Sequence, residues 1–263
     1  MAVVLGGVLA CGIAGAQSDA DGIKADLTGK PLILRGFWEG KRLEFDAAGK
    51  PVKQYAVQSF TVSGFDMSQV TVSGDRVEIQ GKRVGLRLDQ VPEVREPLDK
   101  MTIVIDRKGG EDVGPALKAI FAGGVGEVVG SLPGFWQPYA RKRWIHSDTG
   151  APGAQPAAAA KTAEHSSAPP KSQGRVSPPV LIHADDPEFT AEARSKKVTG
   201  NVQVYMWVGE DGLPSHVRIV RPLGLGLDEF AVASVLKYRF KPSMQDGKPV
   251  KVDLYIEVNF AIF

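Results

Sequence analysis

The stretch from Ser147 to Pro179 constrains the fold of this chain most, since it holds six prolines and eight alanines among its 33 residues. A segment of this composition buries too little apolar surface to offset the entropy lost on ordering, which predicts a disordered linker over residues 147–179. The whole chain of 263 residues is long enough for two domains. We therefore expect an N-terminal module at residues 24–146 and a C-terminal module at residues 180–263.

Composition and charge exclude several kinds of site. The 32 basic and 30 acidic residues give a net charge of +2, which does not favour a nucleic-acid partner. A single cysteine, Cys11, excludes an internal disulfide and a cysteine zinc site, and four histidines make a histidine metal cluster unexpected. Gly130-Ser131 lacks the spacing of a nucleophile elbow. We expect no catalytic residues, no metal and no cofactor, and hence no enzyme.

The first eighteen residues are mostly apolar or glycine and carry no charge. Ala14-Gly15-Ala16 has the small-x-small pattern of a signal-peptidase site, which predicts export. A membrane span needs about 20 mostly apolar residues, and glycines dilute this stretch. Residues 1–18 are therefore interpreted as a signal peptide or a degenerate membrane anchor.

The N-terminal module has the pattern of a mostly-β fold. Short alternating apolar runs are separated by glycine, proline and aspartate; they cover residues 32–34, 42–45, 60–62, 70–72, 77–79 and 101–105. Gly74-Asp75 and Gly81-Lys82 predict hairpin turns. From Ala116 to Phe121 the apolar spacing becomes helical.

Four aromatic residues, Phe135, Trp136, Tyr139 and Trp144, lie around the basic run of residues 141–143. Large aromatic side chains serve mainly to be buried, so we expect them to close the β core of the N-terminal module. A carbohydrate contact is the alternative, and base stacking a weaker one.

The C-terminal module has the clearest pattern. A helix is expected at residues 188–197, an alternating strand at 201–208, a turn at Asp211-Gly212 and a second strand at 216–221. Asp228 is expected to cap a helix that ends near Tyr238, and Asp246-Gly247 to form another turn. The last strand, residues 250–263, is expected to bury one face, made of Val252, Leu254, Ile256, Val258, Phe260 and Ile262. The fold class is α+β, and this module is a three-stranded antiparallel sheet packed by two helices.

These signals occur in a recognisable order along about 80 residues. The motif residues are Gly200, Asp211, Gly212, Leu227, Asp228, Arg239, Phe240, Pro242, Gly247 and Pro249. In order and spacing they resemble the TonB C-terminal domain, with its G-x-V strand, D-G hairpin, L-D helix start, R-F-x-P exit and G-x-P-V entry to the last strand.

The resemblance implies a periplasmic adaptor of a Gram-negative envelope that docks outer-membrane TonB-dependent receptors and supports energised transmembrane transport. The receptor's box peptide would add to the sheet as a further strand, since an edge strand offers unpaired backbone groups. The expected docking edge is the last strand, with outward residues Lys251, Asp253, Tyr255, Glu257, Asn259 and Ala261.

The resemblance also implies a second partner, the ExbB-ExbD proton-channel motor, if an anchor is retained. The family's anchor carries a serine and a histidine, and Met1 to Ala16 contains neither. The alternative function is therefore an unenergised periplasmic module that binds a peptide or a glycan and reuses the TonB-like domain.

Overall fold

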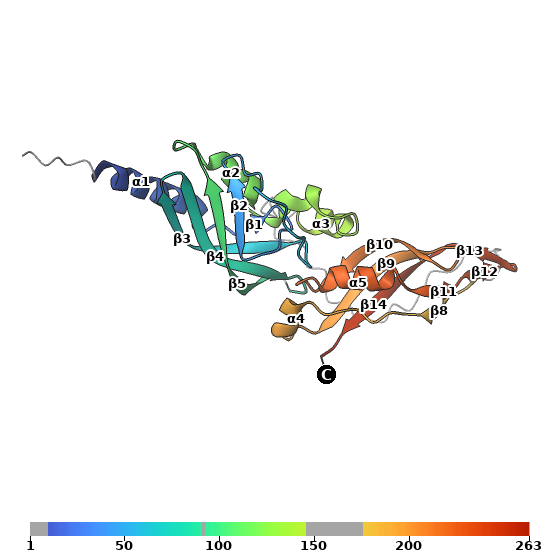
Figure 1. Cartoon of the computed structure of the whole chain (residues 1–263). Coiled ribbons are helices and arrows are strands. Elements are labelled where there is room, and N and C mark those ends of the chain that lie inside the picture. Colours follow the sequence, from blue (N-terminus) through green and yellow to red (C-terminus); the bar gives the residue numbers. More distant parts are fainter. Residues whose placement is uncertain (1–9, 91–92, 146–175, 263) are drawn as a thin grey trace, which may run out of the picture. The chain divides into compact units, whose positions relative to one another are not determined.

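The computed structural model describes residues 10–90, 93–145 and 176–262 (Figure 1). The chain divides into two compact units. The first contains residues 1–131 with Gly224–Gly226, and the second contains residues 132–223 with 227–263.

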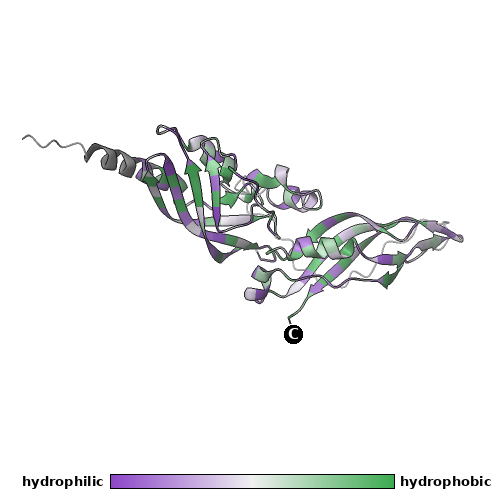
Figure 2. Cartoon of the chain, viewed as in Figure 1, coloured by the Kyte–Doolittle hydropathy of each residue, from purple (hydrophilic) through white to green (hydrophobic). Residues whose placement is uncertain are grey.

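The first unit is built on one six-stranded sheet. Its strands are β1 (Ile33–Leu34), β2 (Arg42–Asp46), β3 (Ser63–Ser73), β4 (Arg76–Arg87), β5 (Val94–Asp106) and β6 (Phe121–Ala122). Their order across the sheet is β2-β5-β4-β3-β1-β6. All neighbours are antiparallel except β2 and β5, which run parallel. The predicted mostly-β character of this part of the chain agrees with this sheet, and Figure 2 shows hydrophobic and hydrophilic residues alternating along its strands.

Three helical segments accompany the sheet: α1 (Ala10–Leu27), α2 (Gly114–Ile120) and the 3-10 helix η1 (Val125–Ser131). Helix α1 packs against β3, with Ile23 and Leu27 in the core and Asp19 paired with Arg107 at 3.0 Å. The expected cleavage site at residues 14–16 lies within α1, while residues 1–9 lie outside the described residues. None of the helices in the described ranges is both long and apolar enough to cross a bilayer.

One of the two expected hairpins in this unit is wrong. Gly74-Asp75 does connect β3 to β4, since Ser73 pairs with Arg76. Gly81-Lys82 instead lies inside β4, where the pairing with β3 shifts by one residue between Met67 and Gln69. A Cβ on Gly81 would lie 2.3 Å from the carbonyl oxygen of Asp66. The glycine marks a close backbone approach at a bulge, which sequence alone does not distinguish from a turn.

The second unit holds the other elements. They are α3 (Gln137–Arg143), β7 (Val176–Ser177), β8 (Val180–His183), α4 (Ala191–Ser195), β9 (Gly200–Val208), β10 (Pro214–Arg221), α5 (Leu227–Val235), β11 (Arg239–Lys241), β12 (Ser243–Gln245), β13 (Lys248–Val250) and β14 (Val252–Phe260). The main sheet is antiparallel with the order β10-β9-β14, and two small sheets, β11-β8 and β13-β12-β7, accompany it.

The main sheet buries one face. Val202, Val204, Met206 and Val208 of β9 are fully buried, as their alternation predicts, and α5 packs on β9 and β10. Thr190 caps α4, because its hydroxyl accepts the N–H of Ala193 at 3.0 Å. The predicted α+β class and the three-stranded sheet with two helices are confirmed.

Three details of this unit differ from expectation. Helix α4 covers Ala191–Ser195 and not 188–197, because Thr190 is extended and begins the helix late. The expected last strand is two strands, with β13 pairing with β12 and β14 pairing with β9. Ile262 is 43% exposed rather than buried, since it lies beyond the end of β14 and has no partner strand there.

The residues that flank the Pro/Ala-rich segment belong to the second unit. Residues 132–145 fall in this unit, whereas the sequence places them in the N-terminal module. Val176 and Ser177, expected in the linker, form β7 and pair with β12. The rest of the predicted linker lies outside the described residues. The predicted domain limits at 24, 146 and 180 therefore stay predictions, while the compact units divide at residue 131.

Candidate functional site

Two residues of the family motif, Gly212 and Phe240, are in close backbone contact. Gly212 has φ +75° and accepts the N–H of Phe240 at 3.0 Å. A Cβ at Gly212 would lie 2.0 Å from the carbonyl oxygen of Phe240. Only glycine fits this position, both for its φ and for the space available. Asp211 supports the same turn by accepting the N–H of Leu213 at 2.9 Å.

The other motif residues hold the connections of the second unit. Leu227 and Asp228 are fully buried at the start of α5, and the Asp228 carboxylate accepts the N–H of Leu223 at 2.8 Å. The contacts of the remaining motif residues follow in chain order. Gly200 begins β9, Arg239 pairs with His183, Phe240 is buried, Pro242 lies between β11 and β12, Gly247 turns β12 into β13, and Pro249 pairs with Met244. The structure thus gives these residues a role in the fold.

Strand β14 lies at one edge of the main sheet. It pairs with β9 from Val252 to Phe260, and no other strand in the described residues pairs with it. Lys251, Asp253, Tyr255, Glu257 and Asn259 are exposed, and Ala261 is half-buried. Of the opposite face, Val258 and Phe260 are buried while Val252, Leu254 and Ile256 are half-buried.

The direction of the free backbone groups on β14 follows from the register. The N–H of Ile219 donates to the carbonyl of Phe135, so it points away from β9. Ile219 pairs with Val204, and Val204 pairs with Ile256. Ile219 and Val204 are therefore a non-hydrogen-bonded pair of the antiparallel ladder, and the backbone groups of Val204 point away from β10, toward Ile256. The backbone groups of successive residues in a strand point to opposite sides. The backbone groups of Tyr255, Glu257 and Asn259 consequently point to the open edge.

The opposite edge of the sheet, at β10, is covered by residues 132–145, which we name the aromatic brace. Phe135 accepts the N–H of Ile219 at 3.0 Å, and Trp136 donates its indole N–H to Glu229 of α5 at 3.1 Å. Trp136 and Trp144 are each 1% exposed and stack with ring centroids 5.9 Å apart. The expectation that these aromatics close the N-terminal β core is wrong, since they belong to the second unit. Trp136 and Trp144 are too deeply buried to offer a face to a sugar or a base, whereas Phe135 and Tyr139 are half-buried.

The outer face of the main sheet carries a further aromatic group. Trp207 lies 3.9 Å from the ring of His216 and 4.1 Å from the ammonium of Lys251, measured to ring centroids. Its indole N–H donates to the hydroxyl of Tyr205, which in turn packs edge-on against Tyr255. The expected docking residues Lys251 and Tyr255 therefore already have partners on this face, while the edge of β14 stays open.

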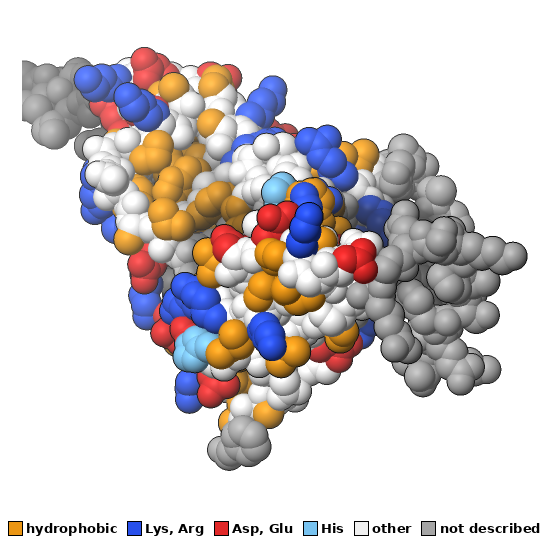
Figure 3. Space-filling model, turned by 90° about the vertical axis from the view of Figure 1, so that its right-hand side faces the viewer, with side chains coloured by type: hydrophobic (Ala, Val, Ile, Leu, Met, Phe, Trp, Pro, Cys, Tyr) orange, Lys and Arg blue, Asp and Glu red, His pale blue; other side chains and the backbone are white. Residues whose placement is uncertain are grey.

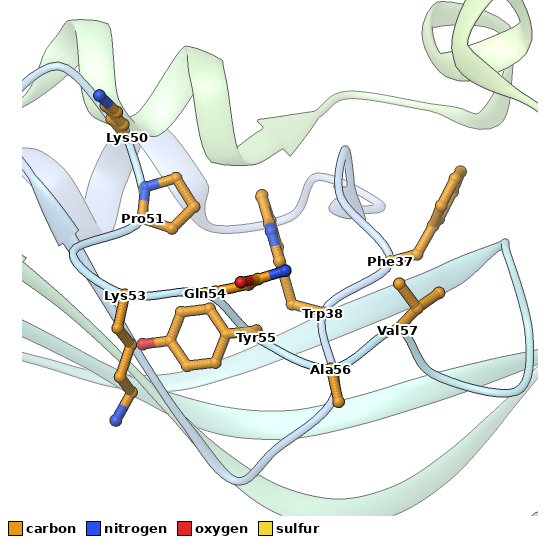
Figure 4. Close-up of a pocket in the computed structure, with 9 residues that line it drawn as sticks. All are labelled: Phe37, Trp38, Lys50, Pro51, Lys53, Gln54, Tyr55, Ala56 and Val57. Atoms are coloured by element: carbon orange, nitrogen blue, oxygen red, sulfur yellow. The ribbon is translucent and has the colours of Figure 1, made fainter.

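The first unit has an open pocket of about 430 Å³ (Figure 4). It is lined by Phe37, Trp38, Lys50, Pro51, Lys53, Gln54, Tyr55, Ala56 and Val57. The sequence analysis missed it because these residues lie between strands. The signal that could have found it is a pair of lysines, Lys50 and Lys53, shortly before Tyr55 and downstream of Trp38.

Charges of both signs alternate over the face that Figure 3 shows. Within the described residues no group of three or more metal-ligating side chains occurs. Hydrogen bonds to Glu78 and Glu44 raise the pKa of Arg42, and a hydrogen bond to Asp89 raises that of Arg87. Both arginines thus stay cationic and form ion pairs within the first unit.

The second unit is thus an α+β domain whose main sheet, among the described residues, has one open edge at β14 and one covered edge at β10. Residues 185–262 match the family model described as Gram-negative bacterial TonB protein C-terminal. This segment of the chain is similar to the TonB C-terminal family.

The known proteins that are similar to the chain include the following two. A protein TonB of Vibrio cholerae serotype O1 is 25% identical over 99 residues, which cover 35% of this chain and 41% of the length of that relative. The chain thus matches about two fifths of this curated relative. A solution NMR structure of the Pseudomonas aeruginosa TonB C-terminal domain is 21% identical, covers 32% of this chain and 86% of that chain, and has a TM-score of 0.28.

Proposed function

We propose that this protein is a TonB-family adaptor that docks an extended receptor peptide along the outer edge of β14. The observation that carries the proposal is the difference between the two sheet edges: β14 is open, while the aromatic brace covers β10. An open edge strand binds an extended peptide through backbone hydrogen bonds, which give affinity with modest side-chain specificity.

The wider role follows from the family. The partner is an outer-membrane TonB-dependent receptor with its box peptide, the location is the periplasm of a Gram-negative envelope, and the task is support of energised transport without catalysis. Coupling to the ExbB-ExbD motor belongs to the same proposal. Strand addition suits a pulling task because many backbone hydrogen bonds share the load.

The direction of the backbone groups supplies a sharp test. Proline at residue 259 removes a donor that faces the open edge and leaves the pairing of β14 with β9 in place, since proline is tolerated at the free side of an edge strand. Asn259→Pro is therefore expected to weaken binding of a receptor box peptide by about tenfold or more, the equivalent of 1.4 kcal/mol. The measurement is calorimetric titration of the full chain.

Asn259→Ala is the matched control. It removes the side-chain hydrogen bond from Asn259 to Asn201, which is 2.7 Å long, and keeps the backbone N–H. Its affinity should stay within about twofold of the wild type, because only a surface hydrogen bond is lost. Equal binding by Asn259→Pro and wild type would show that β14 is not the docking edge.

A further inference from the structure

The pocket of the first unit has walls that are fixed before any ligand arrives. The ring of Trp38 packs edge-on against the buried Phe45, with centroids 5.0 Å apart. The hydroxyl of Tyr55 accepts the N–H of Glu44 at 2.6 Å. Arg83, only 8% exposed, donates to the carbonyl of Trp38 at 2.8 Å. Side chains held in this way lose little entropy on binding, which favours affinity.

The polar groups around these walls are donors without partners. Neither Lys50 nor Lys53 forms a salt bridge with any residue that the structure describes, although the ammonium of Lys53 lies 5.4 Å from the centroid of Tyr55. Across the described part of the chain, the indole N–H of Trp38 and the amide of Gln54 likewise form no hydrogen bond. The nine lining residues include no carboxylate. This set fits a ligand that accepts hydrogen bonds and carries negative charge.

The backbone of the pocket argues against an added peptide strand. The two segments that form it already pair with each other, because Glu39 donates to Ala56 at 2.8 Å and Gln58 donates to Phe37 at 2.8 Å. A peptide would find few free backbone groups there. Half-exposed aromatic faces in an open pocket instead suit a ring with an apolar face and polar edges. A volume of about 430 Å³ is adequate for a small ligand.

From these contacts we propose that the pocket binds a saccharide that carries a carboxylate. The sugar ring lies against Trp38 and Tyr55, and the positive charges of Lys50 and Lys53, on opposite sides of the pocket (Figure 4), attract the carboxylate. Gln54 and the indole N–H of Trp38 bond the ring hydroxyls. This site belongs to the first unit and does not depend on peptide docking at β14.

The test compares two disaccharides with the full-length protein. One contains N-acetylglucosamine linked to N-acetylmuramic acid, and the other is chitobiose, which lacks the lactyl carboxylate. The acidic disaccharide should bind at least about tenfold more tightly in low salt, because a charge-assisted hydrogen bond contributes that much. Calorimetric titration gives both affinities, and high salt should reduce the difference.

Two variants locate the site, and each has a matched control. Lys50→Gln with Lys53→Gln should reduce the preference for the acidic disaccharide to less than about twofold, whereas the same change at the exposed Lys82, which does not line the pocket, should leave it intact. Val57, 72% exposed, allows a charge to be placed at the rim without disturbing the core. Val57→Glu should weaken the acidic disaccharide by at least about tenfold, with Val57→Gln as its control.

Several results would overturn the proposal. The proposal is overturned if neither disaccharide binds, if both bind equally to the wild type, or if the lysine variants keep the preference. Binding of a proline-rich peptide in place of the disaccharides, lost in Val57→Glu, would assign the pocket to a peptide and also overturn it. A melting curve for each variant, unchanged from wild type, ensures that a loss of binding reflects the pocket.

Discussion

At the scale of single residues, the motif position Gly212 tolerates little change. An alanine there has to adopt φ near +75° and its Cβ lies 2.0 Å from the carbonyl oxygen of Phe240. The left-handed conformation and the overlap together should cost about 2–5 kcal/mol in Gly212→Ala. Hydrogen exchange of the β9 amides in the full chain measures the change in this unit.

Gly247→Ala is the control for that substitution. Gly247 has φ +77°, but no atom lies within 4 Å of a Cβ built there. The loss should therefore be limited to the backbone cost of about 1–2 kcal/mol. If both variants lose the same stability, the close approach to Phe240 contributes nothing.

At the scale of elements, the aromatic brace is a structural part of the second unit although it lies outside the family match at residues 185–262. Trp136 is 1% exposed and bonded to Glu229. Trp136→Ala should destabilise the second unit by about 3–5 kcal/mol, because it opens a large cavity. The amide of Ile219, which donates to Phe135, should exchange faster in this variant.

The exposed Lys142 of α3 provides the comparison, and Lys142→Ala should change the free energy of unfolding by less than about 0.5 kcal/mol. Faster exchange confined to the sheet of the first unit in Trp136→Ala would assign the aromatic brace to that unit instead.

The strands and loops show which structural features could be predicted from the sequence and which could not. Alternation at residues 202–208 identified the buried face of β9, because a half-buried strand has a period of two. The turn at Asp246-Gly247 was also found, since both residues have positive φ. Trp136 and Trp144 were assigned to the wrong unit, because apolar character predicts burial and not the partner. The pocket at Trp38 was missed because its walls come from segments without periodicity.

At the scale of the whole molecule, the described ends of the Pro/Ala-rich segment, at residues 145 and 176, belong to the same unit. A protease site placed at residues 157–160 should therefore give two fragments that stay together in native buffer, held by the packing of the aromatic brace. Native size-exclusion chromatography after cleavage is the measurement, with denaturant to separate the fragments.

Combining that protease site with Trp136→Ala and Trp144→Ala should weaken the association of the fragments, since the hydrogen bond from Trp136 to Glu229 and two buried rings are lost. Residues 224–226 of the C-terminal fragment, which belong to the first unit, remain unchanged. Separation of the fragments upon cleavage of the otherwise unchanged protein would contradict the packing of residues 132–145 on the second unit.

The position of the aromatic brace has a mechanical consequence. While it is packed, a pull on β14 passes through β9 and β10 to Phe135 of the aromatic brace within the second unit. If the aromatic brace is torn away, it stays joined to β7 through the 30 residues from 146 to 175. A chain of this length spans at most about 100 Å when fully extended. The rupture force of the aromatic brace thus separates two mechanical regimes. Below this force the path from β14 to residue 132 runs through the packed second unit and is short, and above it the path follows the chain and is longer.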